Sequence, residues 1–362
     1  MIVVKRLFFG LFLLLVSAIF GLFLLYWWGG QAQLTERQYV TTLTQSGTVD
    51  QDSDTLRVMT YNIGWMSGMT NNRPVQRTDS LYHVHFQMVV TVLQQVQPTM
   101  LGLQEVDFGA DRSRHWHQLD SLADHVGFPN RAAAVNWDKR YVPFPYWPFS
   151  SHYGRMLSGQ GILSHLPVQH QVREVLPMPP SSFLYQRFYI DRLIQWGILS
   201  WQDTSVALLN VHLEAWHQPT RQQQGRRVAQ LADSLRHHHL VLVAGDFNAE
   251  PPQRLSAHSG NHDSTLWPLQ EKGFRSVTYQ PGQTEDWMYT YSAVTPRLSI
   301  DHIFYHPAQW QPVSARVVTE VGDVSDHLPV VADFVRASSE APLQARENEV
   351  NTGPKGAVTL IE

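Results

Sequence analysis

The sequence lacks cysteine and has few charged residues. None of its 362 residues is cysteine, which excludes disulfides, zinc–thiolate sites and cysteine nucleophiles. Charged residues make up 16% of the chain, against about 25% in an ordinary soluble domain. Because acidic residues outnumber Lys and Arg by 31 to 27, a globally basic nucleic-acid-binding protein is disfavoured. The absence of cysteine does not fix the compartment, since a large core needs no disulfides.

Hydrophobic residues are plentiful, at 43% of the chain, and they exclude a disordered protein. An uncharged run covers residues 7–28, and about 20 helical residues span the hydrocarbon core of a bilayer. Lys5 and Arg6 precede this run, so the positive-inside rule places the N-terminus in the cytoplasm and the remainder outside. A cleaved signal peptide and a buried core helix are the alternatives, but a signal peptide has an apolar region of only about 7–15 residues. We therefore predict a single-pass membrane anchor over residues 1–28.

The rest of the chain divides by composition. Residues 29–54 are polar and are interpreted as a spacer, and residues 337–362 are predicted to be a flexible tail. Residues 55–336 alternate short apolar runs with helical periods, which is typical of one α/β domain. No helical period occurs between residues 155 and 215, so part of the sheet should be antiparallel or mixed. The expected strands cover residues 56–61, 100–103, 206–213, 240–245, 299–305 and 330–334, and the long helices cover 79–97 and 218–238.

Polar residues gather where these strands begin or end. Any one of them has an ordinary interpretation as a turn residue or a structural histidine. Six such groups are harder to explain in that way, because polar side chains are costly to bury unpaired and sites of α/β sheets are commonly built at strand ends. The groups are Tyr61-Asn62, Gln104-Glu105, Asn210-Val211-His212-Leu213-Glu214, Gly245-Asp246-Phe247-Asn248, Ile300-Asp301-His302-Ile303 and Ser325-Asp326-His327-Leu328-Pro329.

The chemistry of these groups indicates a hard divalent cation. Carboxylate and carboxamide oxygens suit Mg²⁺ or Mn²⁺, and no thiolate is available. Histidines beside carboxylates add proton transfer at neutral pH. A metal ion, a histidine base and an orienting carboxylate are the parts needed to hydrolyse a phosphoester.

The six groups, in this order, resemble the endonuclease/exonuclease/phosphatase superfamily over about residues 56–334. The resemblance implies a four-layer α/β sandwich, in which two packed mixed β-sheets are flanked by helices, preceded here by the N-terminal transmembrane helix. The active site would lie at one edge of the sandwich. For the metal, the resemblance implies Glu105 as the principal Mg²⁺ ligand, Asn62 beside it and Asp326 close to the ion, with Mn²⁺ as an alternative.

The resemblance also implies catalytic roles. Asp246 and Asn248 would orient the attacking water and a phosphate oxygen. His327 would be the general base, held by Asp301. His212 would bind or protonate a phosphate oxygen, and the division of labour between the two histidines stays open.

Two weaker expectations concern the substrate. Gln160 lies in a strand similar to one of the family and is a candidate wall residue, although a structural role is favoured. Tyr153 is a candidate phosphate-side tyrosine by chain order alone. The aromatic, Pro-rich residues 141–149 form either a packed irregular loop or a lip that contacts lipid.

Three functions remain open on the sequence. The first is an extracytoplasmic, membrane-anchored phosphodiesterase or phosphatase acting on a lipid-linked or small phosphoester. The second is a membrane-tethered nuclease acting on DNA or RNA, which the low positive charge disfavours because phosphate contacts dominate nucleic-acid affinity. The third, a catalytically inactive binding module, is disfavoured because every expected catalytic residue is present.

Overall fold

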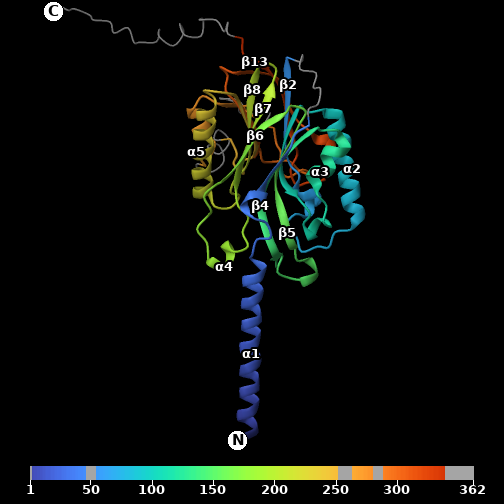
Figure 1. The fold of residues 1–362 in the computed structure, drawn as a ribbon, viewed down its shortest axis with the longest axis vertical. Coiled ribbons are helices and arrows are strands. Elements are labelled where there is room, and N and C mark those ends of the chain that lie inside the picture. The colour runs from blue at the N-terminus through green and yellow to red at the C-terminus, as the bar shows by residue number, and fades with distance from the viewer. Residues whose placement is uncertain (1, 46–53, 252–262, 280–287, 339–362) are drawn as a thin grey trace, which may run out of the picture.

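Two β-sheets lie face to face at the centre of the molecule, with helices on their outer faces (Figure 1). The computed structural model describes residues 2–45, 54–251, 263–279 and 288–338. The seven-stranded sheet has the order β1 (Val40–Leu43), β4 (Asn130–Val142), β5 (Gly154–Ser164), β3 (Met100–Asp107), β2 (Thr55–Asn62), β13 (Val330–Arg336) and β12 (Trp310–Val317). The six-stranded sheet has the order β10 (Arg275–Ser276), β11 (Asp301–Tyr305), β9 (Leu240–Asp246), β8 (Thr204–His212), β7 (Leu193–Trp201) and β6 (Val168–Val175).

Both sheets are mixed. The β2–β3 and β8–β9 pairs are parallel, and the remaining neighbours are antiparallel. The helices are α1 (Ile2–Gly29), α2 (Asp79–Val96), α3 (Gln118–Val126), α4 (Phe183–Gln186), α5 (Gln218–Leu235) and α7 (Trp267–Glu271). Short 3-10 turns occupy Glu36–Tyr39, Gly64–Met66, Gly68–Thr70, Asp111–Ser113, Phe149–Ser151 and Thr319–Val321. The predicted α/β sandwich of two packed mixed sheets flanked by helices is therefore confirmed.

Three apolar layers hold the sandwich together. Phe86 of α2 and Leu122 of α3 pack on the outer face of the seven-stranded sheet. Val228 of α5 packs on the outer face of the six-stranded sheet. Between the sheets, residues such as Val58 and Leu208 form the central layer. Burial of this apolar area is the main driving force for folding, at roughly 25 cal/mol per Å².

The boundaries of α2 follow from local chemistry. Thr78 caps the first turn, because its side chain accepts a hydrogen bond from the Leu81 N–H. Gln97 ends the helix in the left-handed conformation, and Pro98 follows it. The predicted helix over 79–97 is thus present within one residue. The second long helix, expected to reach residue 238, ends at Leu235 as α5.

Two sequence expectations need correction. Residues 29–54 are not only a spacer, because β1 pairs with β4 at the edge of the seven-stranded sheet. The strand carries no apolar alternation, since three of its four side chains are exposed. The interval 155–215 also contains α4, a single helical turn capped by Ser182. Residues 46–53 of the expected spacer and residues 339–362 of the expected tail lie outside the described residues.

The N-terminal helix α1 projects from one end of the sandwich (Figure 1). It is long and apolar enough over Val4–Gly29 to cross a membrane, and its apolar window is not buried by the rest of the chain. The segment that follows the helix is joined to the domain by hydrogen bonds. The backbone N–H groups of Gln33 and Leu34 donate to the Asp138 carboxylate at 2.8–3.0 Å.

A buried polar bridge crosses the apolar layer between the sheets. Asn210 on β8 donates through Nδ2 to the carbonyls of Leu103 and Gly161, at 3.0 and 3.1 Å, and so reaches two strands of the opposite sheet. Its Oδ1 accepts from Gln104 Nε2 at 2.6 Å. Gln160 adds a further cross-sheet bond by donating to the Asn210 carbonyl at 2.8 Å. Since unpaired buried polar groups are costly, these bonds favour one relative placement of the two sheets.

We expect Asn210→Ala to lower the free energy of unfolding by about 3 kcal/mol or more, because it leaves several buried polar partners unsatisfied at about 1–3 kcal/mol each. Denaturant unfolding of the detergent-solubilised protein measures this loss. Gln169→Ala is the matched control, because its exposed amide makes one hydrogen bond, to Ser200, and should cost less than about 1 kcal/mol. Equal losses for the two variants would contradict the bridging role.

Candidate active site

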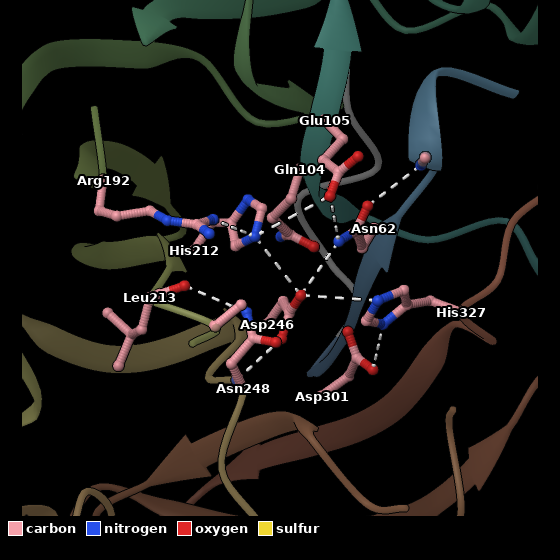
Figure 2. Close-up of polar contacts among 12 residues, drawn as sticks. Asn62, Gln104, Glu105, Arg192, His212, Leu213, Asp246, Asn248, Asp301 and His327 are labelled. Carbon is pink, nitrogen blue, oxygen red and sulfur yellow. Dashed lines mark hydrogen bonds and ion pairs between the residues drawn. The ribbon is translucent and has the colours of Figure 1, made fainter. Parts of the chain in front are cut away.

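Side chains from all six polar groups predicted from the sequence approach one another in the structure (Figure 2). Asn62 and Gln104 are register partners in the parallel β2–β3 pair, and His212 and Asp246 are register partners in the parallel β8–β9 pair. Asp301 faces Asp246 across the antiparallel β9–β11 pair. Because the two parallel pairs belong to different sheets, the site is assembled from both halves of the sandwich.

Asp246 lies at the centre of this arrangement (Figure 2). Its Oδ2 accepts a hydrogen bond from Asn62 Nδ2 at 3.0 Å, and lies 3.6 Å from His212 Nε2 and 3.7 Å from His327 Nε2. Its Oδ1 accepts the Asn248 backbone N–H at 2.8 Å. Burial and the neighbouring Asp301 raise the pKa of Asp246 to about 7, against the lowering effect of His327.

The backbone around Asp246 explains two residues of the Gly245-Asp246-Phe247-Asn248 group. Gly245 has φ +150°, and a side chain there would place Cβ 2.0 Å from the Val211 carbonyl. Asn248 has φ 49°, a left-handed conformation that asparagine tolerates better than most residues. Its side-chain Nδ2 donates to the Leu213 carbonyl at 3.1 Å. The chain therefore turns sharply after β9 and directs Asp246 into the site.

Asn62 and Glu105 form the side of the site that belongs to the seven-stranded sheet. Asn62 Oδ1 accepts the Gly64 backbone N–H at 3.0 Å, which fixes the orientation of the amide. Its Nδ2 consequently faces Glu105 Oε1 at 3.3 Å as well as Asp246. Asn71, which the sequence did not single out, donates to Glu105 Oε2 at 3.1 Å. In this orientation Asn62 positions two carboxylates with its nitrogen and directs no free oxygen at a cation beside Glu105, contrary to its expected place as a ligand.

His327 and Asp301 form a carboxylate–histidine pair. His327 Nδ1 lies 2.9 Å from Asp301 Oδ2, which leaves Nε2 directed at Asp246. The ring of Tyr291 packs against the imidazole with centroids 5.0 Å apart. Burial alone would lower the pKa of His327, but the carboxylates of Asp301 and Asp246 raise it well above its ordinary value.

His212 has a different environment, because a buried arginine contacts it. Arg192 Nη1 lies 2.6 Å from His212 Nε2 and donates to it. Burial, followed by the charge of Arg192, lowers the pKa of His212 well below its ordinary value, so the ring is neutral. Arg192 Nε lies 3.6 Å from Glu214, which also accepts a hydrogen bond from Tyr189 at 2.6 Å. Arg192 is one of several dispersed arginines in the sequence, and its contact with His212 is what distinguishes it in the structure.

Asp326 is a carboxylate whose ionisation is affected by the charge of Glu105. Its pKa is raised by burial and by the neighbouring Glu105, against the lowering effect of His327. The preceding Ser325 fixes the loop, because its hydroxyl donates to the Asn62 carbonyl at 2.8 Å. The charge of Glu105 thus disfavours ionisation of Asp326.

The donor set fits a hard divalent cation. Four carboxylates, Glu105, Asp246, Asp301 and Asp326, gather with few compensating cations. Ligand atoms of Asp246, Asp301 and His327 lie within 4.8 Å of one another, and all three residues are buried. Asp301 Oδ1 has no hydrogen-bond partner among the described residues. Closely spaced, desolvated carboxylates repel one another, and a bound cation would relieve that repulsion.

The two weaker substrate candidates are both buried. Gln160 belongs to the bridge between the sheets and has no exposed surface. Its burial excludes direct contact with a substrate in this arrangement, and the structural role favoured for it fits. Tyr153 packs its ring against Trp65 and lies under the guanidinium of Arg112, with 1% of its surface exposed. The pKa of Tyr153 is raised mainly by burial, and the charge of Glu105 is a lesser raising cause.

Comparisons with known proteins agree with this arrangement. The sequence profile of the endonuclease/exonuclease/phosphatase family matches residues 59–327. No curated protein sequence matches the chain significantly.

Solved structures share the fold at low sequence identity. An endonuclease/exonuclease/phosphatase from Beutenbergia cavernae DSM 12333 is 19% identical, with a TM-score of 0.56, over 78% of this chain and 72% of that one. The mannosyl-6-phosphatase Bt3783 of Bacteroides thetaiotaomicron VPI-5482 is 16% identical, with a TM-score of 0.53, over 77% and 99%. The human nocturnin catalytic domain with bound sulfate is 17% identical, with a TM-score of 0.51, over 84% and 100%.

Proposed function

This chain belongs to the endonuclease/exonuclease/phosphatase family, and we propose that it is a Mg²⁺-dependent hydrolase of a lipid-linked or small phosphoester outside the cytoplasm. The family consists of metal-dependent phosphoesterases and nucleases. The observation that carries the proposal is the buried Asp246, surrounded by Asn62, His212 and His327 within 3.7 Å. A cation, a water molecule and a phosphate group could bind next to one another among these side chains.

Glu105 and Asp326 would hold the cation, with Mn²⁺ as the alternative to Mg²⁺. When bound, the ion offsets negative charge on the phosphoryl group and on the leaving oxygen. Asn62 and Asn71 would keep the Glu105 carboxylate in place, because each donates to one of its oxygens. Asn62 therefore contributes by positioning rather than by ligation.

The charges around Asp246 and His327 support a division of proton transfer between them. Asp246, with a pKa near neutrality, would accept the proton of the attacking water as its oxygen bonds to phosphorus. His327, whose charged form is favoured by two carboxylates, would donate its Nε2 proton to the leaving oxygen as the ester P–O bond breaks. This reverses the base role expected for His327 from family resemblance.

Arg192 would supply positive charge to the phosphate on the side of Asp246 away from His327, and it would hold His212, whose Nε2 accepts from it. Arg192 brings a buried positive charge into contact with His212 and is held by Glu214. A guanidinium suits a phosphate oxygen well, because its N–H groups lie in one plane and remain charged at all physiological pH values. Asn248 would help to orient the water or a phosphate oxygen beside Asp246.

The choice of substrate rests on charge and on α1. The net charge of −4 offers little attraction for a nucleic-acid backbone. Lys5 and Arg6, which precede the uncharged run of α1, favour a cytoplasmic N-terminus, so that the domain lies on the other side of the membrane. Among the structural relatives, the mannosyl-6-phosphatase is named for a small phosphoester. These points support a lipid-linked or small phosphoester over DNA or RNA.

Removal of divalent metal should abolish activity. The detergent-solubilised protein should hydrolyse bis-p-nitrophenyl phosphate with Mg²⁺ and lose that activity with EDTA, with recovery when Mg²⁺ is restored. Glu105→Gln should lower kcat/KM by on the order of 100-fold or more, because it removes a charged ligand. Glu320→Gln, at an exposed carboxylate paired with Arg316, is the matched control and should stay active. Full activity in the presence of chelator would contradict the proposal of a metal-dependent hydrolase.

The leaving group should separate the roles of Asp246 and His327. Asp246→Asn should lower kcat by about 100-fold or more on all phosphoesters, because the acceptor for the water proton is lost. His327→Gln should lower kcat much more for an alkyl phosphoester than for a p-nitrophenyl ester, whose leaving group needs no proton. Equal losses for His327→Gln on both substrates would contradict the donor role.

A side-by-side screen should identify the substrate class. We expect turnover of sphingomyelin or phosphoinositides in bilayers, or of a sugar phosphate in solution, to exceed the rate of plasmid nicking at equal enzyme concentration. Phosphate or headgroup release and gel analysis of the plasmid measure the two activities. Rapid nicking of plasmid DNA with no turnover of lipids or sugar phosphates would instead establish a membrane-tethered nuclease.

A further inference from the structure

Large aromatic side chains stand exposed at one end of the domain. Trp147 and Phe149, in the loop between β4 and β5, are 71% and 70% exposed, and Phe183 on α4 is 71% exposed. Trp216, which follows the end of β8, is 83% exposed. With Tyr146 they form a set that we call the aromatic rim. Exposed clusters of this kind mark surfaces that bind a partner or a membrane.

The rim lies beside the end of α1. The Tyr26 hydroxyl donates to the Phe183 carbonyl at 3.0 Å, and the two rings are 6.2 Å apart. Arg187, just beyond α4, donates to the Trp27 carbonyl at 3.0 Å. Figure 1 shows α4 and the β4–β5 loop at the end of the sandwich from which α1 emerges. Phe183 of the rim is thus at the level of Tyr26 and Trp27, close to the C-terminal end of the apolar helix.

The candidate active site is at this same end. Val142 pairs with Gly154 where β4 and β5 meet the 143–153 loop, and Val106 of β3 pairs with Gly159, five residues further along β5. Glu105, which precedes Val106, therefore lies about 17 Å or more from the start of β5, at about 3.3 Å per residue. Trp216 lies near the site, because its backbone N–H donates to Glu214 at 3.0 Å and Glu214 lies 3.6 Å from Arg192 Nε. The edge that carries the catalytic candidates faces the end where α1 leaves.

We propose that the aromatic rim inserts into the headgroup region of the bilayer that α1 crosses, so that the site faces the membrane and receives phosphoesters of lipid headgroups. Tryptophan and tyrosine rings favour the membrane–water interface, since one part of the ring system is apolar and another is polar. A bilayer is the occupant that matches the rim, because Phe183 of the rim contacts Tyr26 near the end of the exposed apolar helix α1. The choice of lipid substrate rests on the proposed function; insertion of the rim does not.

The absence of cysteine allows insertion to be measured at single positions. The full chain carrying Trp147→Cys or Phe183→Cys, labelled with an environment-sensitive fluorophore, is reconstituted into phosphatidylcholine nanodiscs with or without spin-labelled lipid. Val313→Cys is the control, because Val313 is 63% exposed on β12. The residues on either side of it pair with Asp333 and Phe334 of β13, which in turn pair with the start of β2, far from α1. We expect spin-labelled lipid to quench the label at least twofold at positions 147 and 183 and not at 313. Unquenched labels at both rim positions would overturn the proposal.

A second measurement concerns the substrate. The double variant Trp147→Ser/Phe183→Ser should hydrolyse a lipid phosphoester in nanodiscs on the order of tenfold more slowly, with unchanged hydrolysis of bis-p-nitrophenyl phosphate. Val313→Ser should change neither rate. Equal rates on lipid for the double variant and the control would overturn the substrate part. If the protein hydrolyses no phosphoester, the proposed function fails, whereas the quenching experiment still decides whether the rim is inserted.

Discussion

The amide of Asn210 crosses a largely apolar interface between the sheets, and the site depends on the alignment that it favours. One sheet supplies Asn62 and Glu105, and the other supplies His212, Asp246 and Asp301. A shift of one sheet against the other would separate Asn62 from Asp246, which are 3.0 Å apart. Apolar packing alone tolerates such shifts better than hydrogen bonds do, because dispersion contacts are not directional. The polar bridge therefore links fold stability to the geometry of catalysis.

Much of the site could be predicted from sequence because its residues lie where recognisable apolar runs begin or end. Asp246, Asp301 and His327 were identified in this way, and they meet in the structure. The orientation of the Asn62 amide could not be predicted, since it depends on the Gly64 N–H in a turn after β2. Arg192 was missed for a related reason: its partner Glu214 lies 22 positions along the chain, and neither residue's burial shows in the local pattern.

The fold was predictable to a similar depth. Long periodic helices and buried strands carry strong signals, because their apolar residues repeat at 3.6 or 2 positions. The strand β1 carries none, since it lies at a sheet edge with most side chains in solvent. It joins the sheet through backbone hydrogen bonds to β4, and these do not depend on a particular pattern of side chains. The effect of Asp246 and His327 on each other's pKa could not be predicted either, since it depends on the 3.7 Å between their side chains in the folded chain.

The short connection between α1 and β1 has a consequence for how the enzyme would search for substrate. Residues 30–39 join the helix to the sheet, and Asp138 binds the backbone within that stretch at Gln33 and Leu34. With α1 in a bilayer, the domain would be held at a set height and would diffuse laterally with its helix. Encounters would then depend on the number of substrate molecules per unit area of one leaflet. The concentration of substrate in bulk solution would matter little. Lipids whose phosphoester lies too far above or below the height of the site would not be hydrolysed.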